Sequence, residues 1–427
     1  MIGVVADDTT GANDIGVMFA KHGYHTRVLT LTSELRPEAL ECDAVVIDTD
    51  SRLDSPEVAA EKVRQATRLL MEKGCSVYWK KTCSVFRGNV GVEFDAMMDT
   101  LGADFGVAVA AFPKNGRTTV HGIHSVRGVP LSESEFRGDP VHPMTESDMR
   151  LVLQRQTPHP VGHVDLETVR RGAGAIKEAL DGLRGRVRYA LLDAETQADL
   201  VTIAQATATE KVQLGSSGLA EELPPFWPPV ASGAAGKDVD LFDPCGVFSV
   251  AGSLMPQTRA QVEAASRAGI PCLELDTVAL LAEEGARAEI ERILAAAIPL
   301  LRAGRDVVVH SAHRPEQVAA TKAAGSELGL PEVEVSRAVS RTLAEITVSV
   351  LQATGLKKLV VMGGDTSGTV TRRLGIQGNI VLDEIEPGLP SGLALGVPPL
   401  LLVLKSGSFG KPEFLLKAME HLKEYAN

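Results

Sequence analysis

Short apolar runs that alternate with helical stretches are the feature that most limits how this chain can fold. AVVIDT begins at Ala44, FGVAVAAF at Phe105 and YALLDA at Tyr189, and comparable runs recur towards the carboxyl end. Apolar runs of this length between turn signals predict buried strands, and strands joined through helices pair in parallel. We therefore predict an α/β fold with mostly parallel sheets flanked by helices.

One stretch interrupts the alternation of strands and helices. PPFWPPVASGAAGKDVDLFDPC, at 224–245, is rich in Pro, Gly and Ala and has no sustained periodicity. Such a composition is typical of a linker between domains. A second series of strands and helices begins after it with GVFSVAGS. We predict two domains, over 1–223 and 246–427, each built on its own sheet.

The composition is that of a globular protein and excludes several classes of partner. Of the 427 residues, 44% are hydrophobic and 23% are charged, which is enough for sizeable cores and argues against disorder. With only 4% aromatic residues and a net charge of -12, the chain is not expected to bind nucleic acid. The five cysteines show no C-x-x-C spacing and the histidines fit no zinc motif, so no metal site is predicted from side-chain spacing. The start lacks signal-peptide features and the apolar runs are too short to span a membrane, so we expect a cytoplasmic protein.

The run VVMGGDTSGTV combines an apolar strand, a glycine turn and the start of a helix. Gly363 and Gly364 let the backbone approach an anion closely, and Thr366 and Ser367 supply hydroxyls. The amino end of the following helix directs N–H groups and a positive dipole to the same point, which suits a phosphate. An ordinary strand-to-helix turn, capped by Asp365 or Thr366, remains the alternative.

Two further glycine turns follow apolar strands in the same half of the chain, AGSLMPQT at Ala251 and KSGSFG at Lys405. Because the carboxyl ends of parallel strands meet at one edge of a sheet, Ser253, Gly363 and Gly407 are expected to converge there. Neither a P-loop nor a dinucleotide fingerprint occurs in a strand-turn-helix context. The turns therefore predict a different kind of phosphate site, one that would hold the tail of a nucleotide.

Two carboxylates follow the first strand of the amino-terminal half, in ADDTTGAND. If the strand continues, Asp7 and Asp8 point to opposite sides, and we expect Asp8 to face the site. A carboxylate there accepts the proton of a substrate hydroxyl, or else caps the helix predicted around 13–22. Both roles stay open at this point.

Cations follow the next two strands. DTDSR delivers Arg52, and KKTCSVFRGN delivers Lys81 with Lys80 and Arg87 beside it. Arginine binds a carboxylate through two parallel hydrogen bonds and lysine adds a point charge, so Arg52 and Lys81 suit a short hydroxy acid. A solvated surface charge is the alternative for each of these cations, with more weight for Lys80 and Arg87 than for Arg52 and Lys81.

Together these motifs resemble those of the four-carbon acid sugar kinase family. The resemblance covers essentially the whole chain and rests on ADDTTGAND, KTCSVFRGN, GSSGLA, AGS, GGDTSG, EPG and LKSGSFG. It implies a two-domain, ATP-dependent enzyme that phosphorylates the terminal hydroxyl of a tetronic acid. Mg²⁺ would bridge the phosphate oxygens, and the active site would lie in the cleft between the domains.

The resemblance also implies which residues form the two sites. The amino-terminal domain would bind the acid sugar, with Asp8 and Lys81 as the catalytic residues. The implied acid-sugar contacts are Asp8, Arg52, Lys81, Thr82, Cys83 and Ser84. The implied ATP contacts in the carboxy-terminal domain are Ser253, Gly363, Gly364, Asp365, Thr366 and Gly407.

Three departures from the 3-oxo-tetronate branch of the family favour the threonate-phosphorylating branch. These are Thr9 in ADDTTGAND, the shorter CSVFRGN segment, and Asp365 where a glutamate is common. The predicted reaction converts D-threonate to 4-phospho-D-threonate, with D-erythronate or a 3-oxo-tetronate as the alternative substrate. Enzymes of this class are often dimers, so a second copy of the chain is an expected partner.

Two other classes of function compete with a kinase. A hydroxy-acid dehydrogenase would use the same alternating units, but it lacks its glycine fingerprint here. A protein that only binds or senses an acid sugar has no need of a second set of phosphate-shaped turns.

Overall fold

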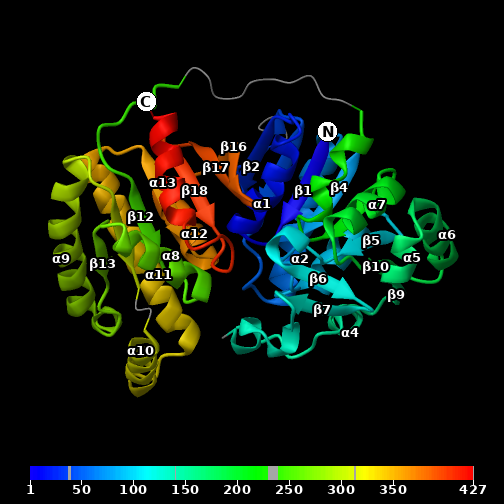
Figure 1. The fold of residues 1–427 in the computed structure, drawn as a ribbon, viewed down its shortest axis with the longest axis horizontal. Helices are drawn as coiled ribbons and strands as arrows, with labels where there is room; N and C mark the ends of the chain where they lie inside the picture. Colours follow the sequence, from blue (N-terminus) through cyan, green and yellow to red (C-terminus); the bar gives the residue numbers. More distant parts are fainter. Residues whose placement is uncertain (37–39, 140, 229–238, 312–313, 427) are drawn as a thin grey trace. The chain divides into compact units, whose positions relative to one another are not determined.

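The structure is a computed structural model that describes residues 1–36, 40–139, 141–228, 239–311 and 314–426. The chain divides into two compact units, Met1–Ala234 and Ala235–Asn427. Each is an α/β unit with helices beside a sheet (Figure 1). Residues 229–238 of the predicted linker lie outside the described residues. Within the described residues, no helix combines the length and the apolar character needed to cross a membrane.

The amino-terminal unit contains the predicted parallel sheet, and every strand pair in it is parallel. Ala6, Asp48, Lys81 and Gly215 lie at the same level of the sheet, at the carboxyl ends of four neighbouring strands. The strands in spatial order are β2 (Thr26–Thr30), β3 (Ala44–Asp48), β1 (Ile2–Ala6), β4 (Val77–Lys81), β11 (Val212–Gly215), β5 (Gly106–Val109), β10 (Tyr189–Leu192) and β9 (Val161–Val164).

Helices cover this sheet because its strands are apolar on both faces. The connections from β1 to β2 and from β3 to β4 run in opposite directions across the sheet, so right-handed crossovers send their helices to opposite faces. The helices are α1 (Thr9–Ala20), α2 (Pro56–Glu72), α3 (Val90–Leu101), α4 (Met149–Gln154), α5 (Leu166–Arg170), α6 (Ala173–Leu183) and α7 (Gln197–Thr207).

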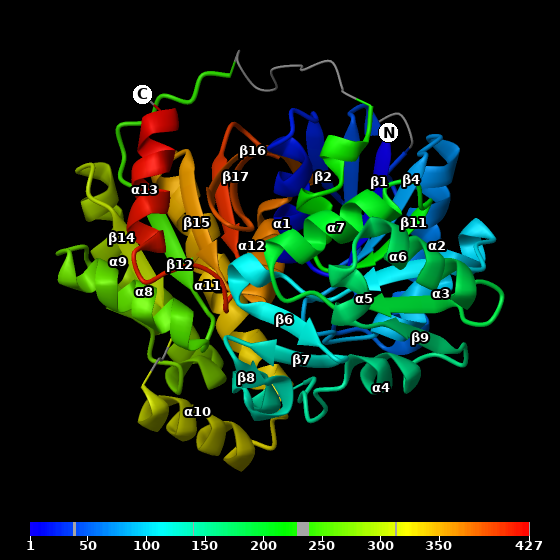
Figure 2. The ribbon, with the colours of Figure 1, turned by 45° about the vertical axis from the view of Figure 1, so that its right-hand side comes forward.

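A small antiparallel sheet in this unit was not predicted. It consists of β6 (Arg117–Val120), β7 (Ile123–Val126) and β8 (Val129–Pro130), and it lies beside α4 (Figure 2). The two hairpins turn at His121-Gly122 and Arg127-Gly128, where all four residues have φ between 50° and 80°. These are two-residue turns with left-handed backbone, and the X-Gly pairs between short apolar segments were their signal in the sequence.

The sheet of the carboxy-terminal unit is parallel in its first five strands and antiparallel in its last two. In spatial order these are β13 (Cys272–Glu274), β14 (Val307–His310), β12 (Phe248–Ala251), β15 (Lys358–Met362), β18 (Leu401–Lys405), β17 (Leu389–Leu395) and β16 (Gly378–Glu386). The β16–β17 hairpin was missed, although Pro387-Gly388 is a strong turn signal and Gly388 has φ 74°.

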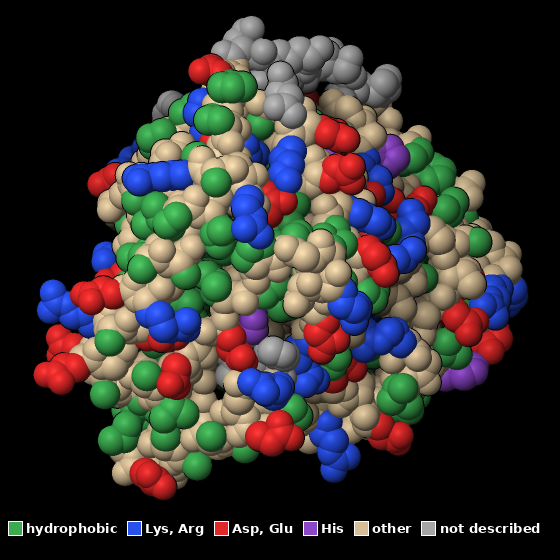
Figure 3. All heavy atoms as spheres, turned by 60° about the vertical axis from the view of Figure 1, so that its left-hand side comes forward, with side chains coloured by type: hydrophobic (Ala, Val, Ile, Leu, Met, Phe, Trp, Pro, Cys, Tyr) green, Lys and Arg blue, Asp and Glu red, His purple; other side chains and the backbone are tan. Residues whose placement is uncertain are grey.

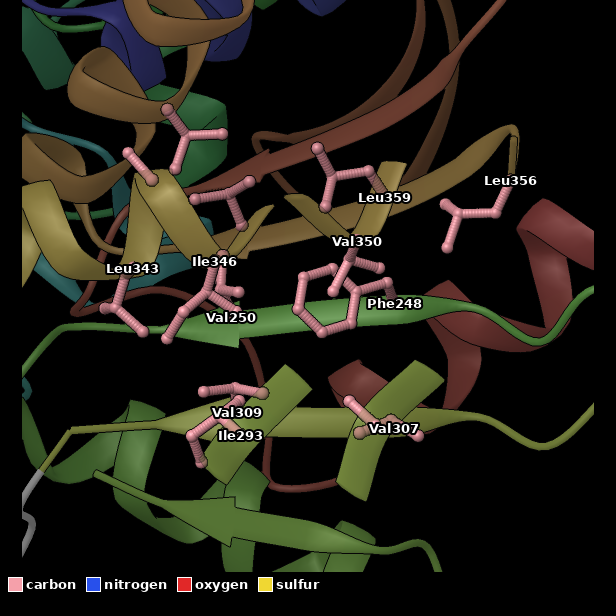
Figure 4. Close-up of a cluster of buried hydrophobic side chains, with 14 of the residues drawn as sticks. Phe248, Val250, Ile293, Val307, Val309, Leu343, Ile346, Val350, Leu356 and Leu359 are labelled. Atoms are coloured by element: carbon pink, nitrogen blue, oxygen red, sulfur yellow. The ribbon is translucent and has the colours of Figure 1, made fainter. Parts of the chain in front are cut away.

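The core of this unit lies between one face of the sheet and two long helices. Phe248, Val250 and Val309 point from the strands towards Ile293 of α9 and Leu343 of α11 (Figure 4). Other helices, including α8 and α13, pack elsewhere on the sheet (Figure 1). The helices are α8 (Pro256–Arg267), α9 (Glu283–Arg302), α10 (Pro315–Glu327), α11 (Glu332–Thr354), α12 (Gly364–Leu374) and α13 (Phe414–Tyr425).

Charged side chains of both signs are mixed on the surface. On the face drawn in Figure 3, Lys and Arg side chains alternate with Asp and Glu side chains. This distribution fits a net charge of -12 spread over the chain. It gives that face no extended basic area of the kind that binds a polyanion.

Candidate active site

The first two carboxylates of the chain share one arginine. Arg52 donates to Asp7 from Nε at 2.8 Å and from a terminal nitrogen at 2.9 Å, and the same nitrogen donates to Asp8 Oδ1 at 2.6 Å. The expectation that Asp7 and Asp8 point apart was wrong, because β1 ends at Ala6 and strand alternation stops there. Arg52 is thus already paired with two protein carboxylates.

Asp8 is also the N-cap of α1. Its Oδ1 accepts from the backbone N–H of Gly11 at 3.0 Å, and its Oδ2 accepts from the Thr10 hydroxyl at 2.7 Å. The predicted capping role is confirmed, but the helix begins at Thr9, four residues before the expected start. Burial raises the pKa of Asp8, but the charges of Arg52 and Lys81 outweigh it and lower the pKa to about 2. Asp8 is therefore ionised at neutral pH.

Lys81 lies between α1 and the loop after β11. It is almost fully buried, its Nζ donates to the carbonyl of Thr82 at 3.0 Å, and it lies 3.5 Å from Asp14 Oδ2. The same Asp14 oxygen accepts a short hydrogen bond from the hydroxyl of Ser217 in GSSGLA. Three separate segments thus meet around one ammonium group.

Asp14 has features that the sequence did not single out. Its Oδ1 is buried and has no hydrogen-bond partner within the described part of the chain. Burial raises its pKa to about 6, against the opposing effects of Lys81 and Ser217, and the charge of Asp8 adds to the rise. A carboxylate that is only weakly stabilised in its charged form can take up a proton near neutral pH.

The predicted segment 82–84 lies beside these residues in chain order. Thr82 is fully buried, and its Oγ1 has no hydrogen-bond partner among the described residues. Ser84 is also buried, whereas Cys83 is partly exposed. Burial would raise the pKa of the Cys83 thiol, but the charges of Arg87 and Arg52 lower it below its usual value.

The structure rules out the alternative of a solvated surface charge for Lys80. It is fully buried, and its Nζ lies 2.7 Å from Glu93 Oε2, whose other oxygen accepts from Ser51 at 2.6 Å. Lys80 also donates to the carbonyl of Lys81 at 3.0 Å. This buried ion pair ties the end of β4 to α3 and to the Arg52 loop, so it positions the site without being part of its surface.

In the carboxy-terminal unit, the three glycine loops lie side by side as predicted. They follow β12, β15 and β18, which are neighbours in the sheet. The backbone N–H of Gly252 donates to Met362 at 3.0 Å, and that of Gly363 donates to Lys405 at 2.8 Å. The loops are therefore joined to one another just beyond the strand ends.

The turn before α12 requires glycine. Gly363 has φ 129° and ψ 135°, a conformation that other residues adopt only with strain. It is the N-cap of α12, so the alternative of a cap by Asp365 or Thr366 was wrong, and both lie in the first turn instead. Backbone N–H groups in this turn point out of the helix, as an anion site requires.

The contacts between the loops leave little room for larger side chains. A Cβ on Gly407 would lie 2.2 Å from Ser253 Oγ, and a Cβ on Gly252 would lie 2.1 Å from Thr366 Oγ1. Ser253 Oγ in turn accepts from the N–H of Met255 at 3.2 Å. The predicted residues Ser253, Thr366 and Gly407 thus belong to one compact cluster.

Comparisons with known proteins match the two units to two different family models. A family model described as a sugar-binding N-terminal domain matches residues 2–223, and one described as a nucleotide-binding C-terminal domain matches residues 248–415. A 3-oxo-tetronate kinase of Pseudomonas savastanoi pv. phaseolicola is 35% identical and aligns over 99% of this chain and 97% of its own. The chain belongs to the four-carbon acid sugar kinase family.

Further relatives extend the same picture. A D-threonate kinase of Salmonella typhimurium is 31% identical over 99% of this chain and 98% of its own. A crystal structure from Salmonella typhimurium LT2 matches with a TM-score of 0.81 and 30% identity, covering 98% of this chain and 99% of that one. This member of the family is accordingly a sugar acid kinase, a phosphotransferase with an alcohol group as acceptor.

A buried lysine lies at the glycine loop after β18. Lys405 is fully buried, and its Nζ donates to Thr258 Oγ1 and to the carbonyl of Gly407, both at 3.0 Å. Burial lowers its pKa to about 7. A protonated Lys405 therefore destabilises the folded chain, whereas a neutral Lys405 does not.

Replacing Lys405 with Met is expected to stabilise the ligand-free kinase, and more so at low pH. Between pH 7 and 10.5, the unfolded chain holds a proton that the folded chain has released, so the cost of the lysine is largest below pH 7 and disappears above 10.5. Thermal unfolding midpoints of both proteins at pH 6.5 and 9.5 test this. An equal shift at both pH values would contradict it.

Proposed function

We propose that this kinase transfers the γ-phosphoryl group of ATP to the 4-hydroxyl of a tetronate. The observation that carries the proposal is the cluster of Asp8, Asp14 and Lys81 at the strand ends of the unit that matches the sugar-binding model. The glycine loops of the other unit supply phosphate-binding geometry.

In this proposal the two carboxylates have different roles. Asp8 accepts three hydrogen bonds and has a pKa of about 2, so it stays charged and orients the hydroxyl. Asp14 has a pKa of about 6, and its Oδ1 has no hydrogen-bond partner among the described residues, so it takes the proton as the hydroxyl oxygen attacks phosphorus. Lys81 lies beside Asp14 and stabilises the negative charge that spreads over the transferring group.

The nucleotide loops fit ATP with Mg²⁺. Within the described residues, no group of three or more His, Cys, Asp and Glu side chains is arranged to hold a metal ion. Mg²⁺ commonly binds one or two carboxylates together with substrate phosphates, so it would arrive with ATP. Asp365, in the first turn of α12, is a suitable carboxylate ligand for Mg²⁺. A carboxylate beside a bound phosphate repels it, and a cation between the two would offset that repulsion. The ion would neutralise charge on the phosphates during transfer.

Two acids are candidates for the substrate. The motif departures favour D-threonate, which remains our prediction from the sequence. A 3-oxo-tetronate is the second candidate because relatives named 3-oxo-tetronate kinase, at 35% identity, are more similar to this chain than the D-threonate kinase at 31%.

A coupled ADP-release assay with D-threonate, D-erythronate and their 3-oxo relatives tests the function. The proposal expects ADP formation that depends on one of these acids and on Mg²⁺, with the highest kcat/KM for the true substrate. Binding of a tetronate without any ADP release would instead favour the sensing protein, and turnover with NAD(H) would favour the dehydrogenase.

A further inference from the structure

The carboxylates around Arg52 make it a poor binding site for the carboxylate of an acid substrate. Arg52 makes three hydrogen bonds to Asp7 and Asp8, and the nearby Lys81 lies next to Asp14. Three carboxylates therefore surround two cations. Such a cluster can hold a hydroxyl. It does not attract the carboxylate of a substrate strongly, because Asp7 and Asp8 already neutralise Arg52.

Arg87 offers what Arg52 lacks. It lies in the loop between β4 and α3, four residues beyond Cys83, and its side chain is 18% exposed. One terminal nitrogen donates to Asp139 at 2.7 Å, and the guanidinium lies 5.2 Å from the centre of the Phe136 ring. Its Nε is buried and has no partner among the described residues. A buried N–H without an acceptor is costly unless a ligand supplies one.

The neighbours of Arg87 also indicate an anion. Burial and the charge of Arg52 oppose protonation of Arg87, but Cys83 and Asp139 outweigh them and hold the pKa of Arg87 above its usual value. Asp139 is a carboxylate that compensates Arg87. A substrate carboxylate at Arg87 would accept from its Nε, which has no partner among the described residues.

We propose that Arg87 binds the carboxylate of the acid substrate and thereby makes the kinase select sugar acids over neutral polyols. This inference rests on the proposed kinase function. With the carboxylate at Arg87, the opposite end of a four-carbon chain carries the 4-hydroxyl, the group that Asp8, Asp14 and Lys81 would receive. The two ends of the substrate then meet two separate sets of charges, which fixes its direction in the site.

A purely structural role for Arg87 is the competing explanation. Through Asp139 and Phe136 it holds the segment 135–139 against the loop after β4. Loss of that contact would disturb the site as a whole and would affect every substrate alike. Loss of a carboxylate contact affects only substrates that carry the carboxylate, so a neutral analogue separates the two explanations.

The test compares Arg87→Gln with the wild type on the tetronate and on the four-carbon polyol of the same configuration. We expect kcat/KM for the acid to fall by about 10- to 100-fold, mainly through KM, because a charge-assisted bidentate contact is lost. The polyol value and KM for ATP should stay within about twofold. Arg137→Gln is the matched control. Among the described residues this exposed arginine, beside Phe136, donates to the carbonyl of Ser132, so its loss should leave kcat/KM for both substrates unchanged.

Each outcome decides the question. Equal losses for acid and polyol, or an unchanged KM for the acid, would overturn the proposal. If polyol turnover is too slow to measure, the 4-deoxy acid serves as an inhibitor that cannot be phosphorylated. Its inhibition constant must then rise in the variant while KM for ATP stays constant. If Arg87→Gln does not fold, Arg87→Lys keeps the charge, loses the bidentate geometry and should raise the KM of the acid alone. A wild type that phosphorylates no tetronate would refute the proposed function instead.

Discussion

Replacing Asp14 with Asn is expected to lower kcat by about 100-fold or more, the usual contribution of a positioned general base. The carboxamide keeps the size of the side chain and can still accept from Ser217 and Lys81. What it cannot do is take up the proton of the attacking hydroxyl. Steady-state kinetics with saturating ATP measure the change.

The pH dependence gives this prediction a second readout. Since the pKa of Asp14 is raised to about 6, the wild-type kcat/KM should fall as the pH drops through 6 and level off above it. The Asp14→Asn variant should lack this limb. Asp95→Asn is the control. Asp95 accepts from Thr157 and Tyr189, and within the described residues no hydrogen bond or ion pair joins it to Asp8, Asp14 or Lys81, so its loss should leave kcat and the pH profile unchanged.

Asp14→Asn should raise the stability of the fold although it lowers kcat. Between pH 3.8 and 6, the folded chain holds a proton on Asp14 that the unfolded chain has released, so the cost of the charged side chain grows with pH and is complete above 6. Asp14→Asn is therefore expected to raise the unfolding midpoint at pH 8 but not at pH 4.

A near-normal kcat in the Asp14→Asn variant would show that Asp14 is not the general base.

Replacing Gly363 with Ala is expected to raise KM for ATP by at least about 10-fold. The backbone at Gly363 has φ 129°, where a Cβ is strained by about 1 to 3 kcal/mol, so the turn must shift. A Cβ there would also lie 3.3 Å from Ser253 Cβ. Because Gly363 directs the first turn of α12, a shift misaligns the N–H groups that would bind phosphate.

The other end of the same helix provides the matched control. Gly375 follows α12 with φ 76°, and a Cβ there would meet nothing within 4 Å. Gly375→Ala should therefore cost about 1 kcal/mol of stability and leave KM for ATP unchanged. If both variants bind ATP like the wild type, the Gly363 turn is not part of the nucleotide site.

The local patterns of the chain predicted the strands and the loops at their ends. Apolar runs such as AVVIDT at Ala44 were recognisable because both faces of a parallel strand are buried. Parallel pairing then placed the loops after β12, β15 and β18 together, and with them Ser253, Gly363 and Gly407. The α12 helix begins at Gly364, directly after the cap at Gly363.

What could not be predicted was the pairing of charges across the chain. Asp14 meets Ser217 across 203 positions, and no spacing rule links them. A surface position had more weight for Lys80 than for Lys81 in the sequence, yet Lys80 pairs with Glu93 on the following helix and is buried in the core. Such pairs depend on which side chains face each other after packing, which a periodic pattern does not contain.

The most direct test of the account is nuclear magnetic resonance of the complete reaction mixture of kinase, Mg²⁺-ATP and the best tetronate from the screen. The account predicts ADP and a phosphomonoester in equal amounts, with phosphorus coupled to the protons on C4. ADP with inorganic phosphate, or phosphorus coupled to C2 or C3, would contradict transfer to the terminal hydroxyl.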